Sequence, residues 1–422
     1  MSSDQKTYKK LKLLKFKLFS LLEITKEINE NASSKELFSH FEFILKNQLS
    51  IGSAVLFSKQ GKHWKCVLKY GVKGNEKKFN IGNDLEHFKD ITTIESSSKE
   101  HLNFFDVVIP VYHKSVPLAY LILGDLNEEA IKISPVIKHL TFIQTLASII
   151  SVAIENKRLA KQDVKQEGMK KELELASEMQ KMLFPEELPN NHKIQLAALY
   201  KPHHQVGGDY YDYIEITENI FLFCLADVSG KGVSAALLMS NFQANLRALV
   251  SLNPTLEDLV HQLNEKVFQT AKGEKFITLF IAKYNTISRE LVYVNAAHNP
   301  PILKSSGETQ FLDKGCTGLG MFDVIPKLEV GIIEIPEMST LMCYTDGVVE
   351  LENDAKQEYG TDRLVNYLKN SKALGMKKLN KELATELAIF KEVQPYIDDI
   401  ALLCCKFFRF TFWLLMINLN RY

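Results

Sequence analysis

The chain has 422 residues and carries 51 basic and 51 acidic side chains, so its formal net charge is zero. Hydrophobic residues make up 46% and charged residues 24%, which is the composition of a globular protein with material for more than one core. This composition excludes a wholly disordered chain, and the absence of a basic excess argues against a dedicated nucleic-acid binder. At about 100–200 residues per domain, the length predicts two or three domains.

The six cysteines are scattered along the chain and form no Cys-x-x-Cys pair; they are Cys66, Cys224, Cys316, Cys343, Cys404 and Cys405. This pattern argues against a zinc ribbon or a disulfide scaffold and favours a reducing compartment. No apolar stretch reaches the roughly 18 residues that a membrane span requires. We therefore expect a cytoplasmic protein without a membrane span.

The first part of the chain has the pattern of a compact α/β module. Residues 18–50 are mainly helical, because apolar residues recur at helical spacing. Short apolar runs predict strands at Ser53–Phe57, Trp64–Leu68, Phe105–Tyr112 and Pro117–Leu123. A second helix is expected from Pro135 to Ala153. We place this module at residues 18–156, after a basic N-terminal tail at 1–17.

A charged segment without strand pattern follows at residues 157–190. It has a modest apolar stripe at helical spacing, and Pro185 and Pro189 are expected to end it. Such a segment is either a plain spacer or a signalling helix that joins two modules. We prefer the signalling helix.

Residues 191–406 have the pattern of a second module, and residues 407–422 form a C-terminal tail of unknown role. The expected helices are Ser234–Val250, Leu256–Ala271 and Leu364–Phe390. The expected strands are Ile220–Asp227, Phe276–Tyr284, Leu291–Asn295, Thr340–Tyr344 and Ile400–Phe407.

Acidic residues stand at the ends of strands in the second module. Asp209 follows two glycines, and Asp227 ends an apolar strand. Asp346 follows a second apolar strand and directly precedes a glycine. The pair Asp398 and Asp399 opens the last apolar strand. Two carboxylates about 4 Å apart repel by several kcal/mol at an effective dielectric constant near 20, so converging carboxylates imply a cation. Without a His/Cys ligand set, hard oxygen donors favour Mg²⁺ or Mn²⁺ over zinc.

The ordered series of motifs resembles the metal-dependent protein phosphatase superfamily (protein phosphatase 2C-like, PPM-type), in its SpoIIE/RsbU-like branch. The matching stretches are ASEMQKMLFPEELP (176–189), YKPHHQVGGDYYD (200–212), LADVSGKGVSAALLMS (225–240), FITLF (276–280), YVNAAHNPP (293–301), YTDGVVE (344–350) and DDIAL (398–402). The resemblance implies an α+β protein whose second module is an αββα sandwich of two antiparallel sheets.

The same resemblance implies the site residues. Asp209, Asp227 and Asp346 are expected to be catalytic and to bind metal through their carboxylates, with Asp398 and the backbone carbonyl of Val228 as further ligands. Two Mn²⁺ or Mg²⁺ ions would activate a water molecule for attack on a phosphoserine or phosphothreonine.

The chain departs from the family pattern at two positions, where Ala297 replaces a glycine and Ala401 replaces a threonine. In addition, Ser229 lies in the stretch where eukaryotic relatives have a histidine. The group that protonates the leaving oxygen therefore stays unassigned. The candidates, each more readily explained as structural, are His203, His204 and His298.

The first module resembles a GAF domain in its helix–sheet–helix order and its position before a phosphatase. This resemblance implies a sensor domain with a small-molecule ligand or partner, and we expect a homodimer. The expected function is a sensor-regulated phosphatase acting on a phosphoprotein, namely an anti-sigma-factor antagonist in a partner-switching pathway. The alternative is a catalytically weak phosphatase fold that signals by binding, against which the intact acidic set argues.

Overall fold

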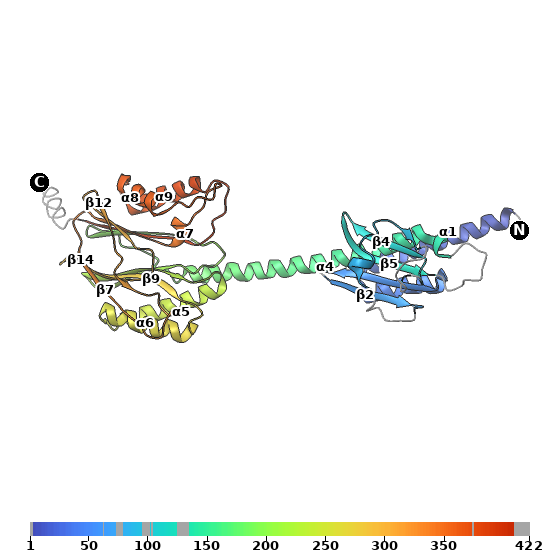
Figure 1. Cartoon of the computed structure of the whole chain (residues 1–422), viewed down its shortest axis with the longest axis horizontal. Helices are drawn as coiled ribbons and strands as arrows, with labels where there is room; N and C mark the ends of the chain where they lie inside the picture. The colour runs from blue at the N-terminus through green and yellow to red at the C-terminus, as the bar shows by residue number, and fades with distance from the viewer. Residues whose placement is uncertain are drawn as a thin grey trace. The chain divides into compact units, whose positions relative to one another are not determined.

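The computed structural model describes residues 3–61, 63–72, 79–94, 102, 104–124, 135–373 and 375–408. These residues form two compact units that divide between Gly168 and Met169 (Figure 1). None of the helices within these ranges combines the length and apolar character needed to cross a membrane.

The first unit is built on a five-stranded antiparallel sheet in the order β2-β1-β5-β4-β3. Its strands are β1 (Ser53–Gln60), β2 (His63–Tyr70), β3 (Thr92–Thr93), β4 (Val107–His113) and β5 (Val116–Gly124). Its helices are α1 (Ser3–Asn29), α2 (Ser34–Phe43), the π-helix η1 (Ile44–Gln48), α3 (Ile81–Asp84) and the part of α4 (Pro135–Lys181) up to Gly168.

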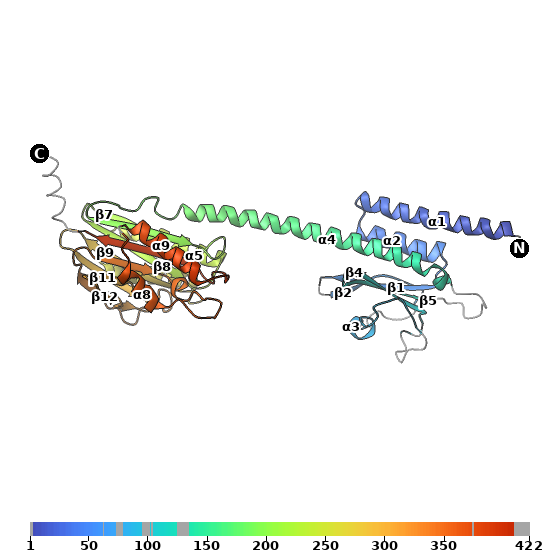
Figure 2. The same ribbon diagram turned by 90° about the horizontal axis from the view of Figure 1, so that it is seen from above.

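Both faces of this sheet are buried. Figure 2 shows α1, α2 and α4 on one side of the sheet and the short α3 on the other. Alternate residues of β1 point to opposite faces, so Leu56 joins the core under the long helices and Phe57 joins the core beside α3. Burial on two sides explains why the strands read as nearly continuous apolar runs.

The N-terminal helix starts much earlier than the sequence pattern suggested. We expected a basic tail at residues 1–17, whereas α1 already begins at Ser3. Its lysines and leucines are strong helix formers, and no glycine or proline interrupts them. The chain turns at Asn31, which has φ 64°, and Ser33 then caps α2 in a capping box with Glu36.

Helix α4 is one continuous helix of 47 residues. It includes the helix expected from Pro135 to Ala153 and most of the segment expected as a separate linker at 157–190. Gly168 lies within it without ending it, and the helix stops at Lys181, before Pro185. The boundary between the expected module and the expected linker therefore has no break in secondary structure.

The second unit contains two sheets. One has the order β13-β10-β9-β8-β7 with β14 paired to β10, and the other has the order β12-β11-β15-β16-β6. The strands are β6 (Ile194–Lys201), β7 (Tyr210–Thr217), β8 (Ile220–Val228), β9 (Ile277–Asn285), β10 (Glu290–Ala296), β11 (Ile302–Ser305), β12 (Glu308–Phe311), β13 (Gly315–Cys316), β14 (Gly331–Glu334), β15 (Thr340–Tyr344) and β16 (Ile400–Phe407). All of these pairs are antiparallel except β10 with β13.

Helices cover the outer face of each sheet, which completes an αββα sandwich (Figure 1). Helices α5 (Val233–Val250) and α6 (Leu256–Ala271) pack on the first sheet, and α8 (Thr361–Asn370) and α9 (Met376–Phe390) pack on the second. Side chains such as Phe223, Phe280 and Leu403 fill the space between the sheets. The expected α+β class with antiparallel sheets is confirmed.

Two expectations for the second unit need correction. The helix expected at Leu364–Phe390 is two helices, because Ser371 leaves the helical conformation and Gly375 precedes α9. The expected tail at 407–422 starts too early, because Phe407 ends β16 and its ring packs 4.7 Å from that of Tyr284. The rest of the tail, from residue 409, lies outside the described residues.

Candidate active site

The register of the first sheet brings two of the acidic motifs together. Strands β7 and β8 are antiparallel neighbours in which Tyr210 pairs with Ala226. Asp209 directly precedes Tyr210, and Asp227 directly follows Ala226. The two aspartates therefore lie beside each other at the same edge of the sheet. Asp209 is only 1% exposed, and its Oδ2 atom has no hydrogen-bond partner among the described residues.

The second sheet brings the other two motifs together in the same way. Tyr344 of β15 pairs with Leu402 of β16. Asp346 therefore begins the short helix α7 (Asp346–Val349) close to the turn that carries Asp398 and Asp399. A hydrogen bond from the backbone N–H of Ala401 to the Thr345 hydroxyl oxygen, 2.9 Å long, holds these segments together.

The carboxylates of the two sheets act on one another electrostatically. Burial, reinforced by Asp227 and Asp399, raises the pKa of Asp209 well above its usual range. Burial and the nearby Asp346 raise the pKa of Asp227 to about 7. Burial and Asp398 also raise the pKa of Asp346. The four motifs thus form one cluster in which negative charge is disfavoured unless a cation balances it.

Asp399 organises the loop of residues 202–209, which contains Gly207 and Gly208 and is called the glycine-rich loop. It does not simply add one more free carboxylate to the cluster. Its Oδ1 accepts the backbone N–H of His203 at 2.6 Å, and its Oδ2 accepts that of Gly208 at 2.7 Å. The sequence offered only the adjacent acidic pair as a sign of this role. Through these two bonds Asp399 takes a direct structural part in presenting Asp209.

Two glycines are required because Asp399 packs against them. A Cβ atom on Gly347 would lie 2.0 Å from the backbone oxygen of Asp399. A Cβ atom on Gly207 would lie 2.2 Å from Asp399 Oδ2 and 2.1 Å from the hydroxyl oxygen of Tyr200. These contacts leave room only for glycine.

Gln180, near the C-terminal end of α4, holds the same loop from the other side. Its amide nitrogen donates to the carbonyl oxygen of Gly207 at 2.8 Å, and its Oε1 accepts the N–H of Gly207 at 3.1 Å. The side chain is buried. Sequence reasoning missed this residue, whose only signal was its place in the ASEMQKMLFP stretch.

Lys231 binds the acidic cluster directly. Its ammonium group lies 2.8 Å from Asp398 Oδ2 and donates to the carbonyl oxygen of Ile397 at 2.5 Å. In the part of the chain that the structure describes, no three His, Cys, Asp or Glu side chains already stand as a complete metal-ligand set.

The residues next to Asp227 have structural contacts. Val228 is buried, and a Cβ atom on Gly208 would lie 3.0 Å from its carbonyl oxygen, so this carbonyl faces the glycine-rich loop. The hydroxyl oxygen of Ser229 accepts the backbone N–H of Phe276 at 2.9 Å. Ser229 therefore fixes the end of β8 to the start of β9.

The histidines considered for proton transfer differ in their surroundings. His298 is buried, its Nδ1 lies 2.9 Å from the Thr278 hydroxyl oxygen, and burial lowers its pKa to about 3. It is therefore neutral near pH 7 and acts as a structural residue. His203 and His204 lie in the loop before Asp209, with ring centroids 4.3 Å apart.

Known proteins resemble mainly the second unit. The family described as Stage II sporulation protein E (SpoIIE) matches residues 217–408. "Phosphoserine phosphatase RsbU" of Bacillus subtilis is 32% identical over 154 residues, which cover 36% of this chain and 46% of RsbU. "Phosphoserine phosphatase RsbP" of the same species is 26% identical over 235 residues, which cover 54% of this chain and 56% of RsbP. The chain thus spans about half the length of these curated relatives.

Among solved structures, the SiaA-PP2C domain of Pseudomonas aeruginosa has the same fold as the second unit. The match has a TM-score of 0.51 at 20% sequence identity and covers 58% of this chain and 98% of that domain. At this identity the likeness concerns the fold alone.

Proposed function

We propose, on the premise that residues 217–408 belong to the SpoIIE family of PP2C-type domains, that this chain is a metal-dependent protein serine/threonine phosphatase. The observation that carries the proposal is the unpartnered, buried Asp209 Oδ2 within a cluster of four acidic motifs from both sheets. A buried carboxylate oxygen without a partner is costly unless a cation or a proton satisfies it.

The proposed ligands are Asp209, Asp227, Asp346 and Asp398, with the carbonyl oxygen of Val228. All are hard oxygen donors, which fit two Mg²⁺ or Mn²⁺ ions. The raised pKa of Asp227 and of Asp346 fits the same assignment, because a divalent cation relieves the repulsion that raises them.

Cations held by these residues would supply an activated water molecule as the nucleophile and would stabilise negative charge on the phosphoryl group. The chain's own side chains provide the frame. Asp399 and Gln180 fix the loop that presents Asp209, and Thr345 fixes the segment that presents Asp346. Neutral, buried His298 takes no part in proton transfer, so the proton donor for the leaving oxygen comes from another group or from solvent.

The proposed substrate is a phosphoserine or phosphothreonine on a signalling protein, namely an anti-sigma-factor antagonist of a partner-switching pathway. RsbU and RsbP, which are named phosphoserine phosphatases, support the choice of phosphoserine. The first unit is proposed to act as the sensor in a homodimer, with α4 carrying its signal. The cysteines form no disulfide among the described residues, which supports a cytoplasmic location.

The test is phosphate release from a phosphoserine peptide with Mn²⁺, Mg²⁺ or EDTA. Asp227→Asn and Asp346→Asn keep the side-chain volume but remove a charged ligand, so we expect turnover to fall by about two orders of magnitude or more. The matched control is Asp313→Asn, an exposed aspartate outside the cluster, with circular dichroism as the check of folding. Near-normal rates for both cluster variants would overturn the proposed metal ligands, whereas no phosphate release by the wild type with either metal would support the binding-protein alternative.

A further inference from the structure

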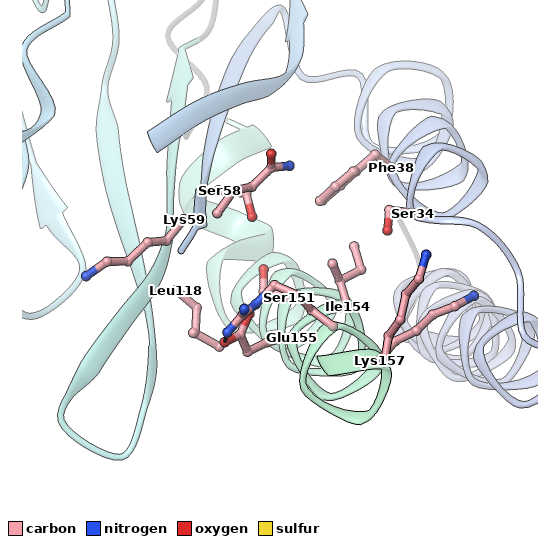
Figure 3. A pocket seen from close by; sticks show the side chains of 12 residues that line it. Ser34, Phe38, Ser58, Lys59, Leu118, Ser151, Ile154, Glu155 and Lys157 are labelled. Atoms are coloured by element: carbon pink, nitrogen blue, oxygen red, sulfur yellow. Dashed lines mark hydrogen bonds and ion pairs between the residues drawn. The ribbon is translucent and has the colours of Figure 1, made fainter. Parts of the chain in front are cut away.

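The first unit contains a cavity of about 380 Å³ on the helix-covered side of its sheet. Its walls come from the start of α2, the end of β1, β5 and the middle of α4 (Figure 3). Every lining residue belongs to the first unit, so the cavity is separate from the acidic cluster. Its volume lies within the range of about 300–1,000 Å³ that is typical of small-molecule sites.

One wall of the cavity is apolar. Phe38 of α2, Leu118 of β5 and Ile154 of α4 line it. Figure 3 shows the Phe38 ring and the Ile154 side chain turned toward the same space. A compact apolar group would be removed from water against these side chains.

The floor of the cavity carries a buried hydroxyl group that has no partner. Ser151 is 4% exposed, and its Oγ forms no hydrogen bond among the described residues. It does not donate to the carbonyl one turn back, as helical serines often do. Figure 3 shows Ser151 and Ser58 facing the same space. Leaving such a group unsatisfied is unfavourable, and a bound acceptor would remove that cost.

The rim of the cavity is positively charged. Glu155 is the single acidic residue that lines it, and its carboxylate pairs with Arg158 at 2.8 Å. The basic residues of the lining are Lys59, Lys157, Arg158 and Lys161, of which Lys59 turns away and lies over the Trp64 ring. The other three cations against one anion make the mouth attractive to negative charge.

One of these cations is fixed in place. The ammonium group of Lys157 donates to the carbonyl oxygens of Asn31 and Ala32, at 3.0 and 3.3 Å. No ion pair of Lys157 is found among the described residues, although its charge is one of the smaller causes that lower the pKa of Glu36. A held cation loses less side-chain entropy on binding an anion than a mobile one.

We propose that this cavity binds a small amphipathic anion, with an apolar body against Phe38 and Ile154 and a carboxylate or phosphate group at the basic rim. The Ser151 hydroxyl donates a hydrogen bond to an oxygen atom of that carboxylate or phosphate group, which lies between Ser151 and the basic rim. The ligand would contact α4 directly, on the helix that continues to Lys181. The inference does not depend on phosphatase activity.

The test uses the full chain in EDTA and follows ligand signals by fluorine NMR. The probes are para-fluorobenzoate and its neutral counterpart para-fluorobenzamide. We expect saturable binding of the benzoate at least tenfold tighter than that of the benzamide. Phenylphosphonate then competes: displacement identifies a phosphate-type headgroup, and failure to displace identifies a carboxylate site.

Variants test whether the probe binds in this cavity. Ser151→Ala should weaken para-fluorobenzoate binding about tenfold, because it removes a hydrogen bond to a charged group. Lys161→Gln should also weaken it, whereas Lys165→Gln, an exposed lysine one turn further along α4 and outside the lining, should not. Equal binding of the two probes, unchanged binding in both Ser151→Ala and Lys161→Gln, or no saturable binding would overturn the proposal.

Discussion

At the scale of single residues, Asp399 shows how a carboxylate can support the proposed metal site without being one of its proposed ligands. It accepts two backbone N–H groups from the glycine-rich loop, and two glycines pack directly against it. The geometry of the loop before Asp209 therefore depends on one side chain contributed from almost the other end of the unit.

The two glycines beside Asp399 should differ in their tolerance of alanine. In Gly347→Ala the new methyl group meets a backbone oxygen, which cannot move away, so we expect a loss of about 3 kcal/mol in the free energy of unfolding. In Gly207→Ala it meets the ends of two side chains, so the loss should be smaller, about 1–2 kcal/mol. Urea unfolding of the purified variants measures both.

A second substitution checks the cause of the Gly207→Ala loss. The hydroxyl oxygen of Tyr200 is buried and has no hydrogen-bond partner among the described residues, so Tyr200→Phe alone should cost little. Combined with Gly207→Ala it should restore part of the lost stability, while combined with Gly347→Ala it should restore none. Equal effects in both backgrounds would contradict the contacts described.

The raised pKa of Asp227 predicts a pH dependence in the metal-free protein. A carboxyl group whose pKa is higher folded, about 7, than unfolded, 3.8, contributes stability below the unfolded pKa. This contribution is lost as the pH rises through the folded pKa. In EDTA, Asp227→Asn should therefore gain stability relative to the wild type between about pH 4 and pH 8, by a few kcal/mol at most. A difference that stays constant with pH would count against the raised pKa.

At the scale of elements, the end of α4 and the glycine-rich loop form one structural unit through Gln180. Gln180→Leu leaves the N–H and the carbonyl of Gly207 without partners, so we expect a loss of about 1–3 kcal/mol in stability. We also expect a weaker response to Mn²⁺, because the loop presents Asp209. The matched control is Gln166→Leu, at an exposed position of the same helix. An unchanged Mn²⁺ titration would show that Gln180 only stabilises the fold.

Several elements were predicted closely from the sequence. The helix Leu256–Ala271 and the strands Thr340–Tyr344 and Ile400–Phe407 have the expected bounds. Their periodicity agrees with clear end signals, such as Thr255, which caps α6 through the N–H of Asp258. The start of α1 was missed because its many lysines leave little difference between an apolar and a polar face of the helix. The short strands β11, β12 and β14 were missed because four residues carry almost no pattern.

At the scale of the whole molecule, α4 is the covalent path between the two units. We expect that inserting two alanines after Gly168 rotates the helix on either side by roughly 200° and disturbs regulation while both units stay folded. A seven-residue helical insertion, about two full turns, should restore the phase and the regulation. The measurement compares basal and stimulated phosphate release. Identical regulation in both insertions would show that α4 acts only as a spacer.

By itself, the sequence determined the order of the modules, the strands and helices with strong periodicity, and the acidic motifs at strand ends, because these are local patterns of a few neighbouring residues. Only the tertiary structure decided which distant groups meet. Gly208 and Asp399 are 191 positions apart in the sequence, and Gln180 and Gly207 are 27 positions apart. The cavity beside Ser151 likewise depends on how two helices pack on a sheet. Such contacts depend on the packing of the complete fold, which no local pattern encodes.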